Sequence, residues 1–66
     1  MEITVNGERR EIPAGLSVAA LIEHLGMPPG RVALERNRDI LPRAQWKSTS
    51  VQPNDVFEIV HFVGGG

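Results

Sequence analysis

Cysteine is absent from the sequence. Disulfide bonds, thiolate metal sites and a redox-active or nucleophilic thiol within the chain are therefore excluded. With 66 residues, the chain is near the lower size limit at which one hydrophobic core keeps a domain folded. We therefore expect a single domain that is stabilised by packing alone and is too small to hold a catalytic cleft easily.

An excess of one charge sign and long apolar runs are also missing. The formal net charge is −1, whereas nucleic-acid binding usually needs clustered positive charge, so we expect no nucleic-acid partner. No apolar run could span a bilayer, and residues 1–4 lack the basic-then-apolar order of a signal peptide, so we expect no membrane association and a cytoplasmic location. Six arginines are expected to form a solvated face, with contact to an acidic partner as the alternative: Arg9, Arg10, Arg31, Arg36, Arg38 and Arg43.

The N-terminal segment has the pattern of a β-hairpin. Apolar and polar side chains alternate over residues 1–5, as in a half-buried strand. Asn6 and Gly7 tolerate the two positive φ angles of a type I′ turn, so the next residues should form the partner strand. A two-residue loop would place Glu2 opposite Glu11, which is a mildly repulsive pair.

A helix is predicted to follow this hairpin. Ser17 can cap its free N–H groups. Apolar residues then recur at i, i+3, i+4 and i+7 and form one stripe for burial: Val18, Leu21, Ile22 and Leu25. Gly26 can adopt the left-handed conformation that closes a helix, and the two prolines that follow cannot continue it. The helix should therefore end near Gly26.

The middle of the chain predicts two more strands and an irregular crossing. Residues 31–35 alternate apolar and polar side chains, as a strand does. Asn37 favours a reversal into a short strand at 40–41. Residues 43–50 have no clear period, and we expect one helical turn at 44–46 within them.

The final strand, predicted over residues 56–63, is the most apolar segment. Its two faces carry Phe57, Ile59, His61 and Val63, and Val56, Glu58, Val60 and Phe62, respectively. Asn54 can adopt the left-handed conformation of the turn before it. A strand that is apolar on nearly both faces belongs in the middle of a sheet.

If the last strand lies parallel to the first, the apolar stripe of the helix can pack onto a single core. That core would contain Ile3, Val5, Val32, Leu34, Phe57 and Ile59. The predicted fold class is α+β, with a mixed sheet of four to five strands and one main helix packed across one face. The β-grasp, or ubiquitin-like, fold has this arrangement.

A glycine tail, Gly64, Gly65 and Gly66, follows the predicted domain of residues 1–63. Glycine adopts nearly any conformation, so the tail should be flexible and able to thread a narrow channel in a partner's active site. A terminal carboxylate becomes electrophilic once ATP converts it to an acyl-adenylate, and a glycine terminus obstructs attack least. The alternative is a frayed end, or a remnant of cloning, without a role.

Several motifs, taken together, resemble the ThiS family of sulfur carrier proteins of thiamine biosynthesis. They are Val5-Asn6-Gly7-Glu8, Asn37 with Ile40-Leu41-Pro42-Arg43, Asp55-x-x-Glu58-Ile59-Val60, and the terminal Gly65-Gly66. The resemblance covers essentially the whole chain. Asn54 departs from the family, whose members often carry glycine before the aspartate, but asparagine can accept the same backbone conformation.

The resemblance implies a carrier that is a recycled substrate and not an enzyme, with no bound cofactor. A ThiF-type, E1-like adenylyltransferase would use ATP and magnesium to adenylate Gly66. A persulfide sulfur donor would then displace AMP and leave a thiocarboxylate on Gly66. A ThiG-type thiazole synthase would consume that sulfur while it builds the thiazole ring of thiamine.

The face of the last strand that the helix does not cover supplies a candidate docking patch for both enzymes: Val60 and Phe62, with the adjoining Val63. The alternative is that residues 43–50 fold over Val60 and Phe62. Glu58 on the same face is either solvated or paired with a partner's arginine.

Single residues elsewhere favour structural readings. His24 and His61 lack the spacing of a metal site and are expected at the surface and at the rim of the domain. Trp46 is expected to close the edge of the core.

Three other functions stay open from the sequence. The carrier could serve molybdopterin or cysteine synthesis, which would use the same tail chemistry. The chain could instead be a ubiquitin-like modifier that forms isopeptide bonds with lysines. It could also be a β-grasp adaptor whose activity does not need the tail.

Overall fold

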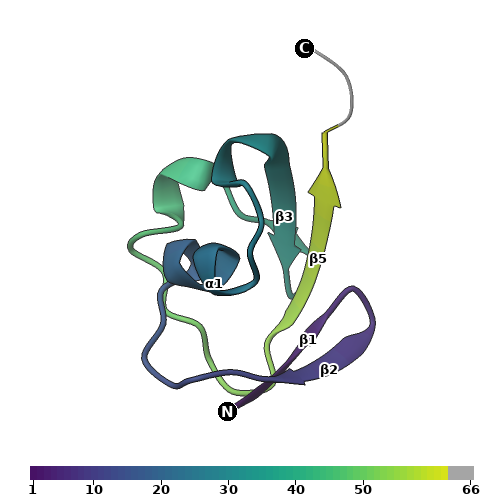
Figure 1. The fold of residues 1–66 in the computed structure, drawn as a ribbon, viewed down its shortest axis with the longest axis vertical. Helices are drawn as coiled ribbons and strands as arrows, with labels where there is room; N and C mark the ends of the chain where they lie inside the picture. The colour runs from purple at the N-terminus through teal and green to yellow at the C-terminus, as the bar shows by residue number, and fades with distance from the viewer. Residues whose placement is uncertain (63–66) are drawn as a thin grey trace.

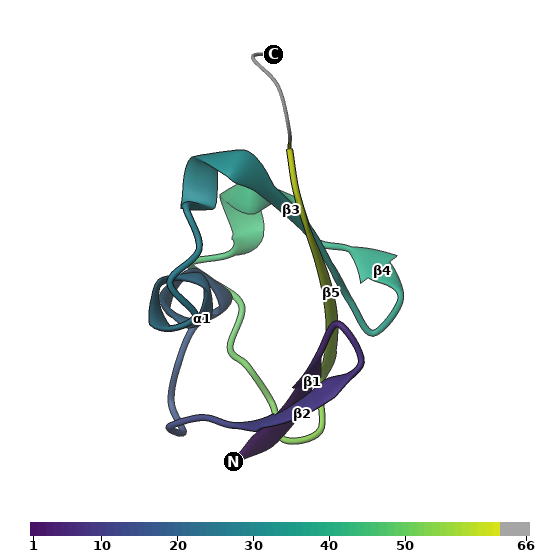
Figure 2. The same ribbon diagram turned by 45° about the vertical axis from the view of Figure 1, so that its right-hand side comes forward.

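In the described part of the chain, five strands form one mixed sheet, and a single α-helix lies across one of its faces (Figures 1 and 2). The computed structural model describes residues 1–62. The strands are β1 (Glu2–Val5), β2 (Glu8–Glu11), β3 (Val32–Arg36), β4 (Asp39–Ile40) and β5 (Val56–His61); the helix is α1 (Val18–His24), and the 3-10 turns are η1 (Pro29–Arg31) and η2 (Arg43–Gln45).

The last strand occupies the centre of the sheet, as its two apolar faces predict. The strand order is β2-β1-β5-β3-β4. β5 runs parallel to β1 on one side and antiparallel to β3 on the other. The predicted α+β class, with a mixed sheet and one main helix, is therefore confirmed.

The N-terminal hairpin has the predicted turn and register. Asn6 and Gly7 have φ angles of 51° and 83°, the sign that a type I′ turn requires at both positions. Glu2 lies opposite Glu11. Their repulsion is offset locally, because Arg9 pairs with Glu2, and the N-terminal ammonium group lies 2.7 Å from a carboxylate oxygen of Glu11.

Helix α1 begins and ends at the predicted residues. The Ala20 N–H donates to the Ser17 hydroxyl at 3.1 Å, and Gly26 has a φ of 75°. The stripe residues Val18, Leu21 and Ile22 are fully buried, whereas Leu25, the C-cap residue, is half-buried. α1 has seven residues, so none of the helices in the described part of the chain could cross a lipid bilayer.

The core lies between the sheet and α1 and contains every predicted core residue. Its buried members are Ile3, Val5, Ile12, Val18, Leu21, Ile22, Val32, Leu34, Trp46, Val51, Phe57 and Ile59. Trp46 is only 3% exposed, and its indole N–H donates to the Leu41 carbonyl at 2.9 Å. The expected closing role of Trp46 is thus confirmed.

The predicted boundaries around β3 and β4 are wrong by one residue. Arg31 belongs to η1, so β3 begins at Val32. Asn37 and Arg38 both have positive φ angles and form a tight turn, so Asp39 pairs directly with Arg36 and starts β4. The turn is shorter than the sequence suggested, because Arg38 adopts a conformation that arginine rarely takes.

Candidate functional site at the end of the central strand

The described chain ends where β5 leaves the sheet. β5 runs from near the N-terminus to the opposite end of the molecule (Figure 1), and Phe62 follows it directly. The predicted tail, Gly64–Gly66, and the patch residue Val63 lie outside the described residues. The site that the structure can describe is therefore the strand that leads to the tail and the surface around its end.

Asn6 extends the pairing of β5 beyond the end of β1. β1 itself pairs with β5 only at Thr4–Val56 and Val5–Phe57. At the next step, the Ile59 N–H donates to Oδ1 of Asn6 at 2.7 Å, and Nδ2 of Asn6 donates to the Ile59 carbonyl at 3.1 Å. The side-chain amide of Asn6 thus takes the place of one residue of a parallel strand. The backbone itself has already turned away from β5 at this point.

The start of β5 is held by a second asparagine. The Asn37 N–H donates to the Val56 carbonyl at 2.7 Å, and the Val56 N–H donates to Oδ1 of Asn37 at 2.9 Å. Nδ2 of Asn37 donates to Asp55 at 3.1 Å. Asparagine side chains therefore hold β5 at its first residue, Val56, and near its middle, at Ile59.

Asp55 is the one buried charged residue in the described chain, with 5% exposure. Its carboxylate accepts hydrogen bonds from the Gln52 N–H at 2.8 Å, from the Asn37 amide and from Nε of Arg36 at 2.9 Å. Burial raises the pKa of Asp55, but these hydrogen bonds and the Arg36 charge lower it by more, so the pKa lies below its ordinary value. Arg36 was predicted to be solvated, and that prediction is wrong because it pairs with this buried carboxylate.

Val60 and Phe62 are exposed on the side of the sheet opposite α1, with 59% and 55% of their surface accessible. Residues 43–50 do not cover them. That segment packs against α1 instead, where the Ala19 N–H donates to the Trp46 carbonyl (Figure 2). Of the two alternatives, the exposure of Val60 and Phe62 is therefore confirmed. Ile40, which is 77% exposed, lies on the same surface.

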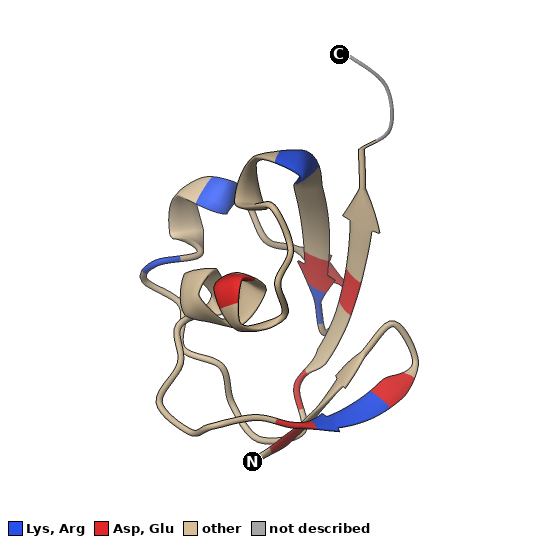
Figure 3. Ribbon diagram, in the orientation of Figure 1, with Lys and Arg blue, Asp and Glu red and all other residues tan. Residues whose placement is uncertain are grey.

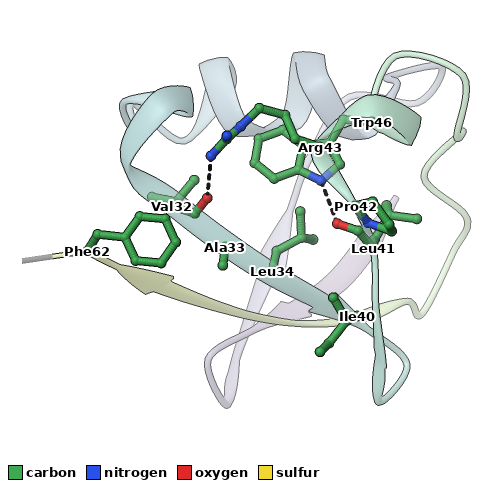
Figure 4. A pocket seen from close by; sticks show the side chains of 9 residues that line it. All are labelled: Val32, Ala33, Leu34, Ile40, Leu41, Pro42, Arg43, Trp46 and Phe62. Carbon is green, nitrogen blue, oxygen red and sulfur yellow. Dashed lines mark hydrogen bonds between the residues drawn. The ribbon is translucent and has the colours of Figure 1, made fainter. Parts of the chain in front are cut away.

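An apolar groove of about 210 Å³ lies along the edge of β3 (Figure 4). It is lined by Val32, Ala33, Leu34, Ile40, Leu41, Pro42, Arg43, Trp46 and Phe62. Ile40 and Phe62 mark its two ends. Because β4 has only two residues, the groove opens where β3 has no strand beside it.

Arg43 forms part of the wall of this groove. Its guanidinium donates to the carbonyls of Pro29 at 3.0 Å and Val32 at 2.9 Å and lies over the Trp46 ring at 5.2 Å. Arg43 is exposed, as predicted, and these contacts hold its guanidinium in one place. The arginine occupies an edge carbonyl of β3 that an additional strand could otherwise use.

Neither histidine belongs to a cluster of metal-ligating side chains in the described part of the chain. His24 and His61 are both exposed, as expected. Within residues 1–62, no three His, Asp or Glu side chains are arranged to hold a metal ion.

Residues 3–66 match the ThiS family. The chain belongs to that family. It is 33% identical to the sulfur carrier protein ThiS of Escherichia coli, and the match spans the whole of both proteins. A crystal structure of the thiamine biosynthesis protein ThiS from Geobacter metallireducens has a TM-score of 0.85 and 32% identity, again with full coverage of both chains. This likeness confirms the β-grasp fold.

Thiazole synthases form a second group of relatives. The chain is 41% identical over its whole length to a thiazole synthase from Paramagnetospirillum magneticum and 39% identical to one from Magnetococcus marinus. In both comparisons it spans 20% of the relative's length. These synthases therefore contain a region similar to this domain together with a much longer remainder.

Proposed function

We propose that the domain is the sulfur carrier of thiamine biosynthesis and that the carboxylate of Gly66 is its working group. The observation that carries the proposal is the ThiS-family match, which includes the glycine tail. The position of β5 supports it, since the strand that precedes the tail is the central strand of the sheet. A rigid β5 followed by glycines would present an acyl group at a defined place with little steric obstruction.

The proposed chemistry is activation of a carboxylate followed by sulfur transfer. An oxygen of the Gly66 carboxylate attacks the α-phosphorus of ATP, with pyrophosphate as the leaving group. The terminal sulfur of a persulfide then attacks the acyl carbon and expels AMP. A thiol cleaves the resulting S–S bond and leaves the thiocarboxylate on Gly66, while Gly64 and Gly65 span the channel of the partner enzyme.

The proposal assigns all catalysis to partners. A ThiF-type adenylyltransferase would bind ATP and magnesium, and a ThiG-type thiazole synthase would take the sulfur. The thiazole synthases among the relatives support the second assignment. The carrier itself would be no enzyme and would bind no cofactor, and the need for ATP favours the cytoplasm as the place of the reaction.

Intact mass measurement tests the proposed function. The chain is incubated with the adenylyltransferase from the same organism, ATP, magnesium and a persulfide donor. We expect a mass gain that corresponds to replacement of one oxygen by sulfur, located by fragmentation at Gly66. A matched variant that lacks Gly65 and Gly66 should keep its fold and gain no sulfur.

Other outcomes of this experiment would favour a different function for the chain. Stable conjugates of higher mass on lysines would favour a ubiquitin-like modifier. If thiazole synthase and its other substrates are then added and the thiocarboxylate is not consumed, a carrier for molybdopterin or cysteine synthesis would be favoured. No mass change in the presence of active enzyme would contradict a sulfur carrier altogether.

A further inference from the structure

Two carboxylates lie side by side on the open face of the sheet. Glu35 on β3 is directly opposite Glu58 on β5, and the acidic segments of the two strands are adjacent in Figure 3. The neighbours of Glu58, Phe57 and Ile59, are buried beneath α1, so Glu58 projects from the other face. Like charges at opposed positions of an antiparallel pair repel each other.

No ion pair within the described chain offsets this repulsion, in contrast to that between the opposed residues Glu2 and Glu11. Ion pairs hold Glu2 with Arg9, Glu8 with Arg10, Glu11 with the N-terminal ammonium group, and Asp55 with Arg36. Over residues 1–62, no ion pair includes Glu35 or Glu58. The two glutamates therefore form a site of concentrated negative charge that a cation from outside could neutralise.

Apolar side chains surround this pair. Ile40 lies opposite Glu35 on its other side, and Val60 follows two positions after Glu58 on the same face. Beyond them the apolar groove runs from Ile40 to Phe62 (Figure 4). When a partner covers such a surface, the apolar contacts can exclude water from a charged contact in their midst, and that contact adds specificity.

We propose that this surface docks thiazole synthase, which places an arginine or lysine between Glu35 and Glu58 and an apolar side chain in the groove between Ile40 and Phe62. The inference rests on the proposed function. It goes further by naming the acidic pair as the element that recognises the partner. Arginine fits best, because its planar guanidinium can donate to both carboxylates at once.

The position of the surface supports this occupant. Phe62 is both an end of the groove and the last described residue before the tail, so an enzyme that receives the tail would come to lie over this face. The relatives named thiazole synthase include a region similar to this domain within one longer protein. Such a covalent link would favour contact between the two parts.

Binding measurements at two salt concentrations test the proposal. Titration calorimetry of the full chain with thiazole synthase from the same organism gives Kd for the wild type, for the double variant Glu35→Gln/Glu58→Gln, and for Glu23→Gln. Glu23 is an exposed carboxylate on α1, on the opposite side of the sheet, and serves as the matched control. The double variant removes only charge, and because it relieves a repulsion, its thermal midpoint should be equal to or above that of the wild type.

We expect the double variant to bind about tenfold more weakly at low salt and to lose most of the salt dependence of Kd, because a charge-assisted contact is screened by ions. The Glu23 variant should match the wild type. Equal affinity and equal salt dependence for the double variant would overturn the proposal, as would failure of the wild type to bind the synthase. A loss confined to the adenylyltransferase would overturn the assignment to the synthase.

Sulfur loading on the adenylyltransferase distinguishes this inference from the proposed function. A wild-type chain that binds the synthase in a charge-dependent way but never accepts sulfur would contradict the sulfur carrier and leave the docking surface intact. A chain that accepts sulfur normally but binds the synthase independently of Glu35 and Glu58 would contradict the docking surface alone.

Discussion

The side-chain amide of Asn6 forms two hydrogen bonds with the backbone of Ile59, 53 positions away in the sequence. The same residue occupies the first positive-φ position of the hairpin turn. Asn6 therefore ends one strand and prolongs the pairing of another. This joint use explains why asparagine suits the position better than glycine, which would satisfy the turn alone.

Replacement of Asn6 should separate these two roles. Asn6→Gly keeps the positive φ but leaves the N–H and C=O of Ile59 without their partners, and we expect a loss of about 1–3 kcal/mol in the free energy of unfolding. Asn6→Ala should cost more, because alanine is also strained at positive φ. Urea unfolding measures both, and amide exchange at Ile59 locates the effect. A glycine variant as stable as the wild type would show that the amide contributes nothing.

The buried carboxylate of Asp55 predicts an acid-sensitive fold. Because its folded-state pKa lies below the ordinary value, the stabilisation by Asp55 is fully present above the unfolded-state pKa of about 3.9 and is lost as the pH falls through the folded-state pKa. Asp55→Asn should lower stability at neutral pH by about 2 kcal/mol, since charged hydrogen bonds to Arg36 and Gln52 are lost.

The unfolding free energy, measured from pH 7 to pH 2, tests this assignment. The difference between wild type and Asp55→Asn should shrink as the pH falls below about 4, because the wild-type carboxylate becomes protonated. Glu23→Asn provides the control, since Glu23 is exposed and forms no ion pair within residues 1–62. A difference that stays constant over the whole range would rule out Asp55 as the source of the pH dependence.

The two phenylalanines should respond in opposite ways to truncation. Phe57 is fully buried, so Phe57→Ala should cost about 3–5 kcal/mol of folding stability. Phe62 is more than half exposed, and Phe62→Ala should change stability by less than about 1 kcal/mol. Under the docking proposal, Phe62→Ala should instead weaken binding of thiazole synthase by about tenfold or more, as expected for an aromatic anchor.

Thermal unfolding and titration calorimetry on the same preparations make this comparison. The matched control is Glu23→Ala, which shortens an exposed side chain on α1, on the opposite side of the sheet. Its binding should be unchanged. Wild-type affinity in Phe62→Ala would remove Phe62 from the docking surface.

The sequence was sufficient for the hairpin, the helix and the core because each depends on short-range patterns. Asn6-Gly7 determined both the turn and the Glu2–Glu11 register. Ser17 and Gly26 marked the helix ends. The two apolar faces of β5 identified the central strand.

The interactions that fix the site were not predictable from such patterns, because they join distant residues through side chains. Nothing near Asn6 indicates that its amide reaches Ile59. In the sequence, nothing distinguishes Arg36 and Arg43 from other surface arginines. In the structure, Arg36 neutralises Asp55, and Arg43 donates to the Pro29 and Val32 carbonyls. The exposure of Val60 and Phe62 likewise depended on the side of the sheet to which residues 43–50 return.

The account depends most on Gly66 as an unobstructed acyl group, and a chain extended by one phenylalanine after Gly66 tests this directly. The extended and wild-type chains are incubated with the adenylyltransferase, ATP and a persulfide donor, and intact mass is followed over time. We predict that sulfur appears on the wild type but not on the untrimmed extended chain, because its carboxylate belongs to a bulky residue. Sulfur uptake by the untrimmed chain at the wild-type rate would contradict the account.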